Sequence, residues 1–243
     1  MLTEKIKRLW EATTKKNVAI GVVSAVVLTG VAYIFFVIVV PFKVNESIDK
    51  FDVKIALLEN GEAMVTETLA YNFSTRQKPL FFRTIPLVSP SGFWMEAEVL
   101  GVKNELGESY EYATSSNNNG LLINIKNPTA WPSKKKTYVI TYRVGGVVRT
   151  ADGRAKLRWN ATGDKWPIEI KNASASVFLE GRPVADLRPD CFAGLAGSAE
   201  KKCSFSQVND GQAAGAVYFA NGPLKSGEGL TIILDFPQGS GAK

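Results

Sequence analysis

The side chains that could do chemistry in this sequence are few, because the 243 residues include no histidine. The usual general base of hydrolases is therefore missing, as is the commonest neutral metal ligand. Ser198 and Lys201 have the S-x-x-K spacing of penicillin-recognising enzymes. The same spacing recurs at Ser47–Lys50 and Ser133–Lys136, and neither Ser-Asp-Asn nor Lys-Thr-Gly accompanies it. The sequence predicts no catalytic residue, and a hydrolase of the Ser-Lys type remains an alternative.

The two cysteines, Cys191 and Cys203, are a second candidate for chemistry. If this part of the chain lies in an oxidising compartment, an even pair of cysteines predicts a disulfide. A zinc site would need more ligands than two thiols, and the chain offers no histidine to supply them. We therefore expect a disulfide, no metal and no cofactor.

A carboxylate falls on a face that should be buried. Alternation places Glu67 on the same strand face as Val65, Leu69, Tyr71 and Phe73. An unpaired charge there would destabilise the fold strongly, so Glu67 needs a partner. The nearest basic residue bracketed by apolar neighbours is Arg83, in FFRTIP. We predict a structural, buried Glu67–Arg83 ion pair.

Two aromatic pairs suggest either core packing or a binding surface. Trp159 and Trp166 flank a turn in RWNATGDKWPIEI, and Phe93 stands next to Trp94. Buried rings of this size would cap a core, whereas exposed ones would form an apolar patch for a sugar or peptide. Structural packing is the first interpretation for both pairs, and a binding surface is the second.

The elements that must position these residues are strands. Apolar residues alternate with polar ones in several segments, and Asn-Gly, Gly-Gly and Asp-Gly turn signals separate them. The alternating segments are 51–57, 121–125, 138–144, 175–179 and 230–236. The pattern predicts an all-β antiparallel β-sandwich, immunoglobulin-like or elaborated, with two packed immunoglobulin-like halves as the architectural alternative.

The first hairpin has two possible registers around Asn60-Gly61. A two-residue turn would set apolar side chains opposite threonines. A three-residue loop with a left-handed Gly61 sets Ile55 opposite Val65, and Phe51 opposite Leu69. The apolar pattern favours the second register.

The N-terminus resembles a signal anchor. Val18 to Val40 is a run of 23 residues without a charge, which as a helix spans roughly 35 Å, enough for a bilayer core. Basic residues precede this run, and acidic residues follow it closely. We therefore expect one transmembrane helix with a cytoplasmic N-terminus and an extracytoplasmic bulk at the plasma membrane. The expected segments are a basic tail (1–17), the signal anchor (18–41), a linker (42–47), the β domain (48–237) and a flexible tail (238–243).

Charge excludes one class of partner. The chain has 29 basic and 23 acidic residues, but the excess is concentrated before the apolar run. No basic stripe interleaved with aromatic residues appears, so nucleic acid is not an expected partner. The lipid bilayer and an envelope protein or polymer are the expected partners.

An ordered series of segments resembles a known family. These are FDVKIALLENGEAMVTETLAYNF, FFRTIP, YVITYRVGGVVR, LRWNATGDKWPIEI, Cys191 with its nearby glycines, and LKSGEGLTIILDFPQG. The series resembles the exterior domain of bacterial predicted membrane proteins grouped as domain-of-unknown-function 2207. The resemblance implies an extracytoplasmic β-rich domain without assigned activity, and further membrane helices in typical members. We expect a non-catalytic binding, docking or sensing module, with a structural assembly subunit as another alternative.

Overall fold

The computed structural model describes residues 3–4, 46–74, 78–88, 92–117, 120–128, 134–180, 186–208 and 215–238. The expected anchor at 18–41 lies outside these residues. Nearly all of the expected basic tail (1–17), most of the linker (42–47) and most of the flexible tail (238–243) lie outside them as well. Within the described ranges, no helix is long and apolar enough to cross a membrane. The chain divides into the units Met1–Lys43 and Val44–Lys243, and the described strands all belong to the second.

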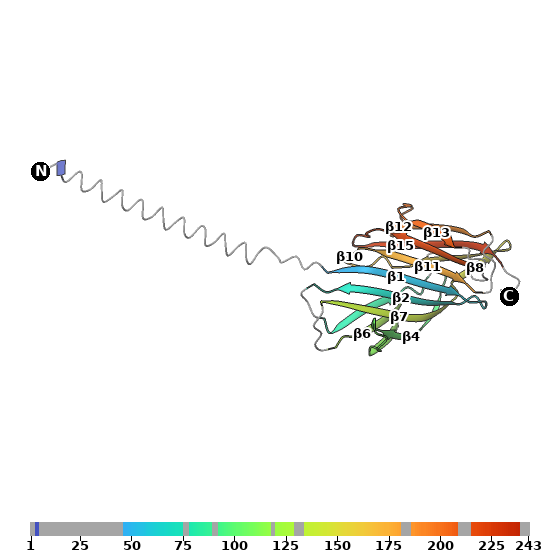
Figure 1. Cartoon of the computed structure of the whole chain (residues 1–243), viewed down its shortest axis with the longest axis horizontal. Coiled ribbons are helices and arrows are strands. Elements are labelled where there is room, and N and C mark those ends of the chain that lie inside the picture. Colours follow the sequence, from blue (N-terminus) through green and yellow to red (C-terminus); the bar gives the residue numbers. More distant parts are fainter. Residues whose placement is uncertain are drawn as a thin grey trace. The chain divides into compact units, whose positions relative to one another are not determined.

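The largest sheet in the described part of the chain has eight strands (Figure 1). Seven of them follow the order β13-β14-β11-β1-β2-β7-β4, and the short β10 pairs with β1. Their bounds are β1 (Ser47–Leu57), β2 (Ala63–Asn72), β4 (Glu96–Lys103), β7 (Lys135–Gly145), β10 (Glu169–Ile170), β11 (Ala173–Leu179), β13 (Ser204–Val208) and β14 (Gly215–Asn221).

Two smaller sheets complete the described strands. One has the order β12-β15-β9-β8, and the other has the order β3-β6-β5. Their bounds are β3 (Leu80–Ile85), β5 (Tyr112–Asn117), β6 (Gly120–Lys126), β8 (Val148–Ala151), β9 (Arg154–Asn160), β12 (Arg188–Leu195) and β15 (Glu228–Pro237). The described domain is therefore all-β, as the alternation predicts.

The first hairpin has the register that the apolar pattern selects. Ile55 lies opposite Val65, and Phe51 lies opposite Leu69. Gly61 has a φ of 86°, and its N–H donates to the carbonyl of Leu58, which closes the three-residue loop. A left-handed residue at this position suits glycine because it carries no Cβ. The prediction of the hairpin register is confirmed.

The expectation of a purely antiparallel sheet is wrong. β1 pairs with β11 in parallel, from Phe51 opposite Ala173 to Leu57 opposite Leu179, and β10 also runs parallel to β1. β2 pairs with one edge of β1 in the antiparallel direction. The strands that follow β9, namely β10 and β11, pair with the other edge of β1. Alternation records which face of a strand is buried, but not the direction of its neighbour.

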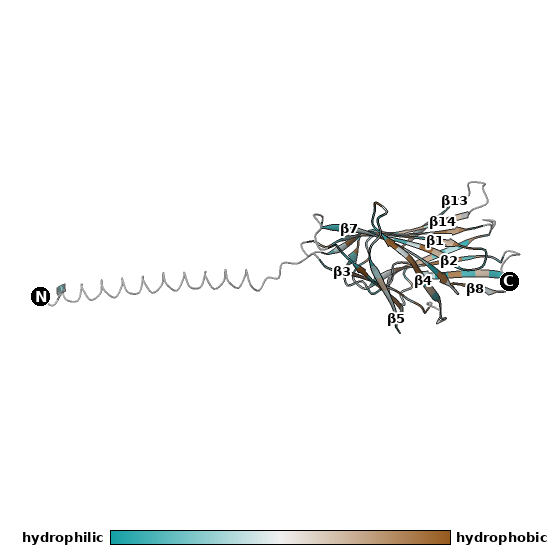
Figure 2. Cartoon of the chain, turned by 90° about the horizontal axis from the view of Figure 1, so that it is seen from below, coloured by the Kyte–Doolittle hydropathy of each residue, from teal (hydrophilic) through white to brown (hydrophobic). Residues whose placement is uncertain are grey.

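The core is continuous across the sheets. Buried apolar side chains from strands of all three sheets form one cluster, including Phe51 of β1, Leu157 of β9 and Ile123 of β6. Brown and teal bands alternate along the strands in Figure 2, as expected when one face of a strand is buried. Phe81 of β3 stacks on Tyr138 of β7, with ring centroids 4.1 Å apart and planes 6° from parallel. This stack joins the small sheet of β3 to the large one.

A carboxylate near the beginning of β1 is held by two lysines. Asp49 lies at a register shift in the β1–β2 pairing, and its oxygens lie 2.6 Å from the Nζ atoms of both Lys135 and Lys171. Partial burial acts to raise the pKa of Asp49, but the lysines and the Ser47 hydroxyl outweigh it. The pKa falls from 3.8 to about 2. The carboxylate is therefore ionised wherever the domain is folded near neutral pH.

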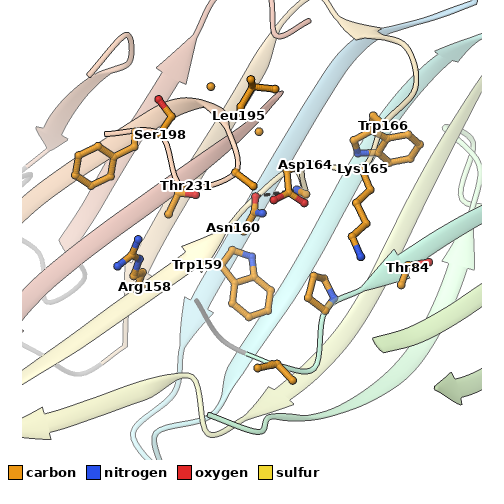
Figure 3. Close-up of a pocket in the computed structure, with 18 of the residues that line it drawn as sticks. Thr84, Arg158, Trp159, Asn160, Asp164, Lys165, Trp166, Leu195, Ser198 and Thr231 are labelled. Atoms are coloured by element: carbon orange, nitrogen blue, oxygen red, sulfur yellow. Dashed lines mark hydrogen bonds between the residues drawn. The ribbon is translucent and has the colours of Figure 1, made fainter. Parts of the chain in front are cut away.

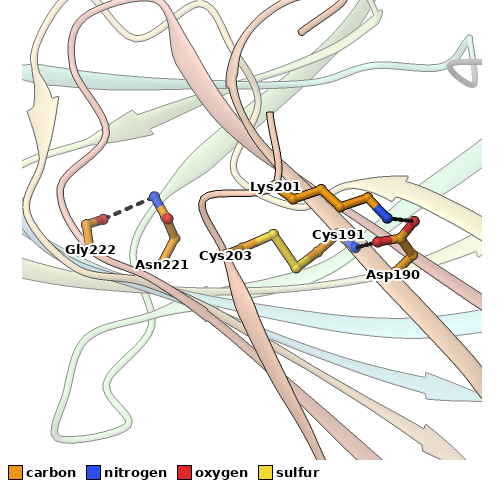
Figure 4. The surroundings of a disulfide bond; sticks show 6 residues. All are labelled: Asp190, Cys191, Lys201, Cys203, Asn221 and Gly222. Atoms are coloured by element: carbon orange, nitrogen blue, oxygen red, sulfur yellow. Dashed lines mark hydrogen bonds and ion pairs between the residues drawn. A yellow bond between two sulfur atoms is a disulfide. The ribbon is translucent and has the colours of Figure 1, made fainter. Parts of the chain in front are cut away.

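Cys191 and Cys203 form the expected disulfide (Figure 4). Cys191 lies in β12 and is buried, and Cys203 lies just before β13, at the edge of the large sheet. The bond therefore fastens β12 of one sheet to the chain that enters β13 of another. It fixes the turn between them, which carries Ser198.

Candidate functional site

A cavity of about 840 Å³ is the candidate site (Figure 3). Four strands line it, namely β3, β9, β12 and β15, together with a loop at 163–167 and a turn at 195–199. The volume falls within the range of roughly 300–1,000 Å³ that is usual for ligand pockets. In Figure 3, Ser198 and Leu195 lie on one side of the cavity, and Lys165 and Trp166 lie on the other.

The floor of the cavity is the outer face of the sheet of β12, β15 and β9. Side chains alternate along these strands, so Leu157, Ile232 and Cys191 point into the core. Their neighbours Arg158 of β9 and Thr231 of β15 belong to the opposite face and line the cavity, as does Phe192 of β12. A face that would otherwise be a solvated sheet surface thus becomes the floor of a concave site.

The loop after β9 is fixed by its own side chains. The Oδ1 atom of Asn160 accepts from the N–H of Gly163 at 3.0 Å. The hydroxyl of Thr162 accepts from the N–H of Leu230 at 2.9 Å, and the indole N–H of Trp166 donates to the carbonyl of Thr162 at 2.8 Å. The segment that the sequence singles out for its two tryptophans is therefore a hydrogen-bonded wall of the cavity.

Glu67 and Arg83 lie together behind this wall. Arg83 donates from Nε and Nη2 to the two oxygens of Glu67, each at 2.7 Å, and the hydroxyl of Tyr142 donates to the same carboxylate at 2.7 Å. The guanidinium carbon lies 5.3 Å from the ring centroid of Phe51 and 5.7 Å from that of Trp166. The pair is therefore buried, bidentate and enclosed by aromatic rings.

The electrostatics of this buried cluster keep the charge on Arg83. Burial acts to lower the pKa of Arg83, but the adjacent Glu67 outweighs burial and the pKa is raised. Burial raises the pKa of Tyr142 well above its usual value, and the neighbouring carboxylate adds to the shift. Tyr142 thus remains a neutral donor to Glu67. Arg83 is itself a lining residue, so this cluster supports the cavity from the core side.

Trp159 is the unusual residue of the site. The residue is 5% exposed and lines the cavity, and its Nε1 is a buried polar atom without a hydrogen-bond partner in the described part of the chain. A buried donor without a partner is costly, and the indole N–H usually finds one. Figure 3 shows the ring beside Asn160. Trp159 belongs to the buried core cluster, so the surrounding protein encloses its N–H.

Three charged side chains at the cavity have no ionic partner among the described residues. Arg158 and Lys165 are exposed, and Asp164 is half-buried. All three line the cavity, so their charges face any molecule bound there. Two cations against one acid give the cavity an excess of positive charge.

The serine and lysine of the S-x-x-K spacing do not meet. The hydroxyl of Ser198 accepts from the N–H of Glu200 at 3.2 Å, in a turn closed by a bond from the N–H of Ser198 to Leu195. Lys201 donates to Asp190 at 3.0 Å (Figure 4). The lysine of a Ser-Lys pair must reach its serine, and here the amine is engaged elsewhere.

The second aromatic pair lies elsewhere. Phe93 and Trp94 are exposed, with Trp94 the more so at 71%, and neither lines the cavity. Arg149 lies over the ring of Phe93 at 3.8 Å from its centroid. Of the four aromatic residues proposed as a binding surface, the structure brings only Trp159 and Trp166 to the cavity.

Sequence reasoning missed several lining residues. Phe82 and Leu195 are exposed by 53% and 64%, and Arg158 and Lys165 supply the cations that have no ionic partner among the described residues. Arg158 and Lys165 fall inside the segment that was singled out, next to its tryptophans. Residues of one site often cluster in a single loop, and this proximity was the available signal. No comparable signal in the sequence indicates Leu195, because its position at the cavity depends on the pairing of strands that are far apart in the sequence.

Metal chemistry finds no support in the described part of the chain. There, no group of three or more histidine, cysteine, aspartate or glutamate side chains lies close enough to hold an ion.

Comparison with known proteins gives the class of the chain. The described fold is an all-β domain with a cavity on one sheet, and a family model described as the N-terminal domain of a predicted membrane protein, DUF2207, matches residues 47–236. The match covers most of the chain, so the protein belongs to this family of predicted membrane proteins. No curated protein matches it.

Solved structures show a distant likeness in arrangement. Leukotriene A4 hydrolase from Saccharomyces cerevisiae aligns with a TM-score of 0.47 and 10% identity, over 78% of this chain and 29% of the enzyme. An M1 zinc metallopeptidase from Deinococcus radiodurans aligns with a TM-score of 0.48 and 10% identity, over 77% of this chain and 42% of that one. A putative protease from Parabacteroides distasonis gives 0.43 and 11%, over 78% and 40%. This chain thus spans less than half of each.

Proposed function

We propose that the protein is a single-pass membrane protein whose β-sandwich domain lies outside the plasma membrane and acts as a non-catalytic binding module. Membership of a family of predicted membrane proteins supports the membrane location. The charge asymmetry around the apolar run at 18–40 supports a cytoplasmic N-terminus. The Cys191–Cys203 disulfide supports an oxidising compartment for the domain.

The cavity carries the proposal of binding. Arg158 and Lys165 have no counter-ions among the described residues, and both line one concave site together with Trp159. Water hydrates these exposed cations in the free protein, and an acidic group of a bound partner would pair with them inside the cavity. The domain therefore docks or senses an envelope protein or polymer at this cavity.

Catalysis has less support than binding. A hydrolase of the Ser-Lys type needs Lys201 at Ser198, and the amine pairs with Asp190 instead. A purely structural assembly subunit would appear as higher oligomers in mild detergent and would not need the cavity.

Photo-crosslinking in intact cells tests the binding role. A benzoylphenylalanine replaces Leu195, an exposed residue of the cavity wall, or Leu106, an exposed residue outside it. The proposal predicts a discrete adduct from position 195 and none from position 106. Equal cross-linking from both positions, or none from either, would overturn it. An adduct that contains only a second copy of this chain would favour the assembly subunit.

A further inference from the structure

β3 is an edge strand with a free backbone edge. In its sheet it pairs only with β6, and the N–H of Asn127 donates to the carbonyl of Pro79 just before the strand. Antiparallel ladders alternate, so the odd-numbered residues of β3 exchange bonds with β6, and the even-numbered residues point away. The outward groups therefore belong to Leu80, Phe82 and Thr84.

This free edge borders the cavity. Phe82, Arg83 and Thr84 are consecutive and all line it, which is expected when a strand presents its backbone edge. The carbonyl of Thr84 accepts from Nη1 of Arg83 at 3.1 Å. The N–H of Thr84 and both backbone groups of Phe82 have no partner among the described residues. Exposed edges of this kind pair with an added strand.

The outward backbone groups of β3 alone would pair with any extended peptide. The charged side chains around them would select among peptides by charge. Arg158 and Lys165 line the cavity and have no ionic partner among the described residues. Asp164 is the single unpaired acid among the described lining residues. Positive charges thus exceed negative ones, which favours carboxylates on the occupant.

We propose that the cavity binds an extended acidic peptide segment of a partner protein, which adds a strand to β3. The inference rests on the proposed binding function and names its ligand class. The backbone of the peptide pairs with Phe82 and Thr84, and its alternate side chains enter the cavity. Carboxylates among these side chains reach Arg158 and Lys165. An envelope polysaccharide would use the charges and the aromatic rings but would leave the edge of β3 unpaired.

Fluorescence anisotropy with the full-length chain in detergent micelles tests this inference. The probe is a fluorescein-labelled peptide of about eight residues, the length of a strand, with alternating threonine and glutamate. The comparison peptides replace glutamate with lysine, or carry N-methyl groups on alternate amides of the glutamate peptide. We expect the glutamate peptide to bind at least about tenfold more tightly than either, which corresponds to the loss of one good interaction.

Charge reversal on the protein separates the cavity from general attraction. The double variant Arg158→Glu, Lys165→Glu should weaken the glutamate peptide by at least about tenfold. Lys103→Glu, compared with each single reversal Arg158→Glu and Lys165→Glu, is the control, because Lys103 is an exposed strand lysine that does not line the cavity. It should leave affinity nearly unchanged. A peptide that responds equally to the variant and the control overturns the inference.

Two further results would overturn the strand mode while leaving the binding function standing. In the first, dextran sulfate competes as well as the glutamate peptide, and N-methylation has no effect, so that only negative charge is recognised. In the second, no peptide binds, although position 195 still gives its adduct in cells. If the adduct is absent as well, the proposed function itself fails.

Discussion

Replacing Glu67 by glutamine tests the energetic role of the buried pair. The change keeps the shape of the side chain but removes the charge that balances Arg83, which is 5% exposed. Breaking a buried ion pair by removing one partner costs about 3–5 kcal/mol, since the remaining charge stays desolvated. For a domain of this size, 1 kcal/mol lowers the melting temperature by about 2–4 °C, so we expect a decrease of about 6–20 °C.

The matched control for this variant is Glu98→Gln. Glu98 forms an ion pair with Arg143 at 2.7 Å, but both side chains are largely exposed, at 64% and 45%. Water and salt screen such a pair, so its loss should shift the melting temperature far less. Differential scanning calorimetry of both variants measures the difference. Equal shifts for Glu67→Gln and Glu98→Gln would refute the argument that burial makes the pair critical.

A double variant separates the pair from its surroundings. Replacing Glu67 by leucine together with Arg83 by methionine removes both charges while keeping much of the volume. Apolar replacement of a whole buried pair is often nearly neutral, so the double variant should be more stable than Glu67→Gln alone. The double variant could instead prove less stable than Glu67→Gln. In that case, losing the hydrogen bond from Tyr142 and the contacts of the rings with Arg83 costs more free energy than leaving Arg83 buried without a counter-ion.

Three further variants probe other parts of the domain. Cys203→Ser should lower stability by about 3 kcal/mol through loss of the short loop closed with Cys191, and calorimetry that shows no change would contradict this. The pKa of Asp49 falls below its unfolded value, so its contribution is complete above about pH 4 and disappears as pH falls through about 2. Asp49→Asn should therefore destabilise near neutral pH and become nearly silent in acid, and a pH-independent difference in melting temperature would refute the assignment. A Cβ at Gly120, whose φ is 129°, would lie 2.2 Å from a backbone oxygen, so Gly120→Ala should destabilise strongly. Gly145→Ala, which meets nothing within 4 Å, should not, and similar melting temperatures for the two would contradict the geometry.

Local patterns in the sequence were enough to predict the first hairpin and its buried acid. The alternation from Phe51 to Leu57 and the apolar run around Glu67 permit one register, since a slip of one residue would expose the apolar face. The charge of Glu67 then required a cation among apolar neighbours, and FFRTIP offered Arg83. These inferences succeed because burial fixes the face of each side chain.

Long-range pairing could not be predicted in the same way. The parallel pairing of β1 with β11 joins segments more than a hundred residues apart, and no local pattern records it. The cavity depends on such pairings, because Leu195 of β12 and Phe82 of β3 belong to different sheets. Trp159 illustrates the limit well. Its position in an alternating strand favoured burial, but its unpartnered N–H emerges only from the packing around it.

Protease access from outside the cell distinguishes an extracytoplasmic domain from a cytoplasmic one. A specific viral protease site replaces the exposed turn at residues 105–107, and the protease is added to cells with opened outer layers and a sealed plasma membrane. We expect cleavage from outside, before the plasma membrane is broken. A chain that remains intact until the membrane is lysed would place the domain in the cytoplasm and contradict the account.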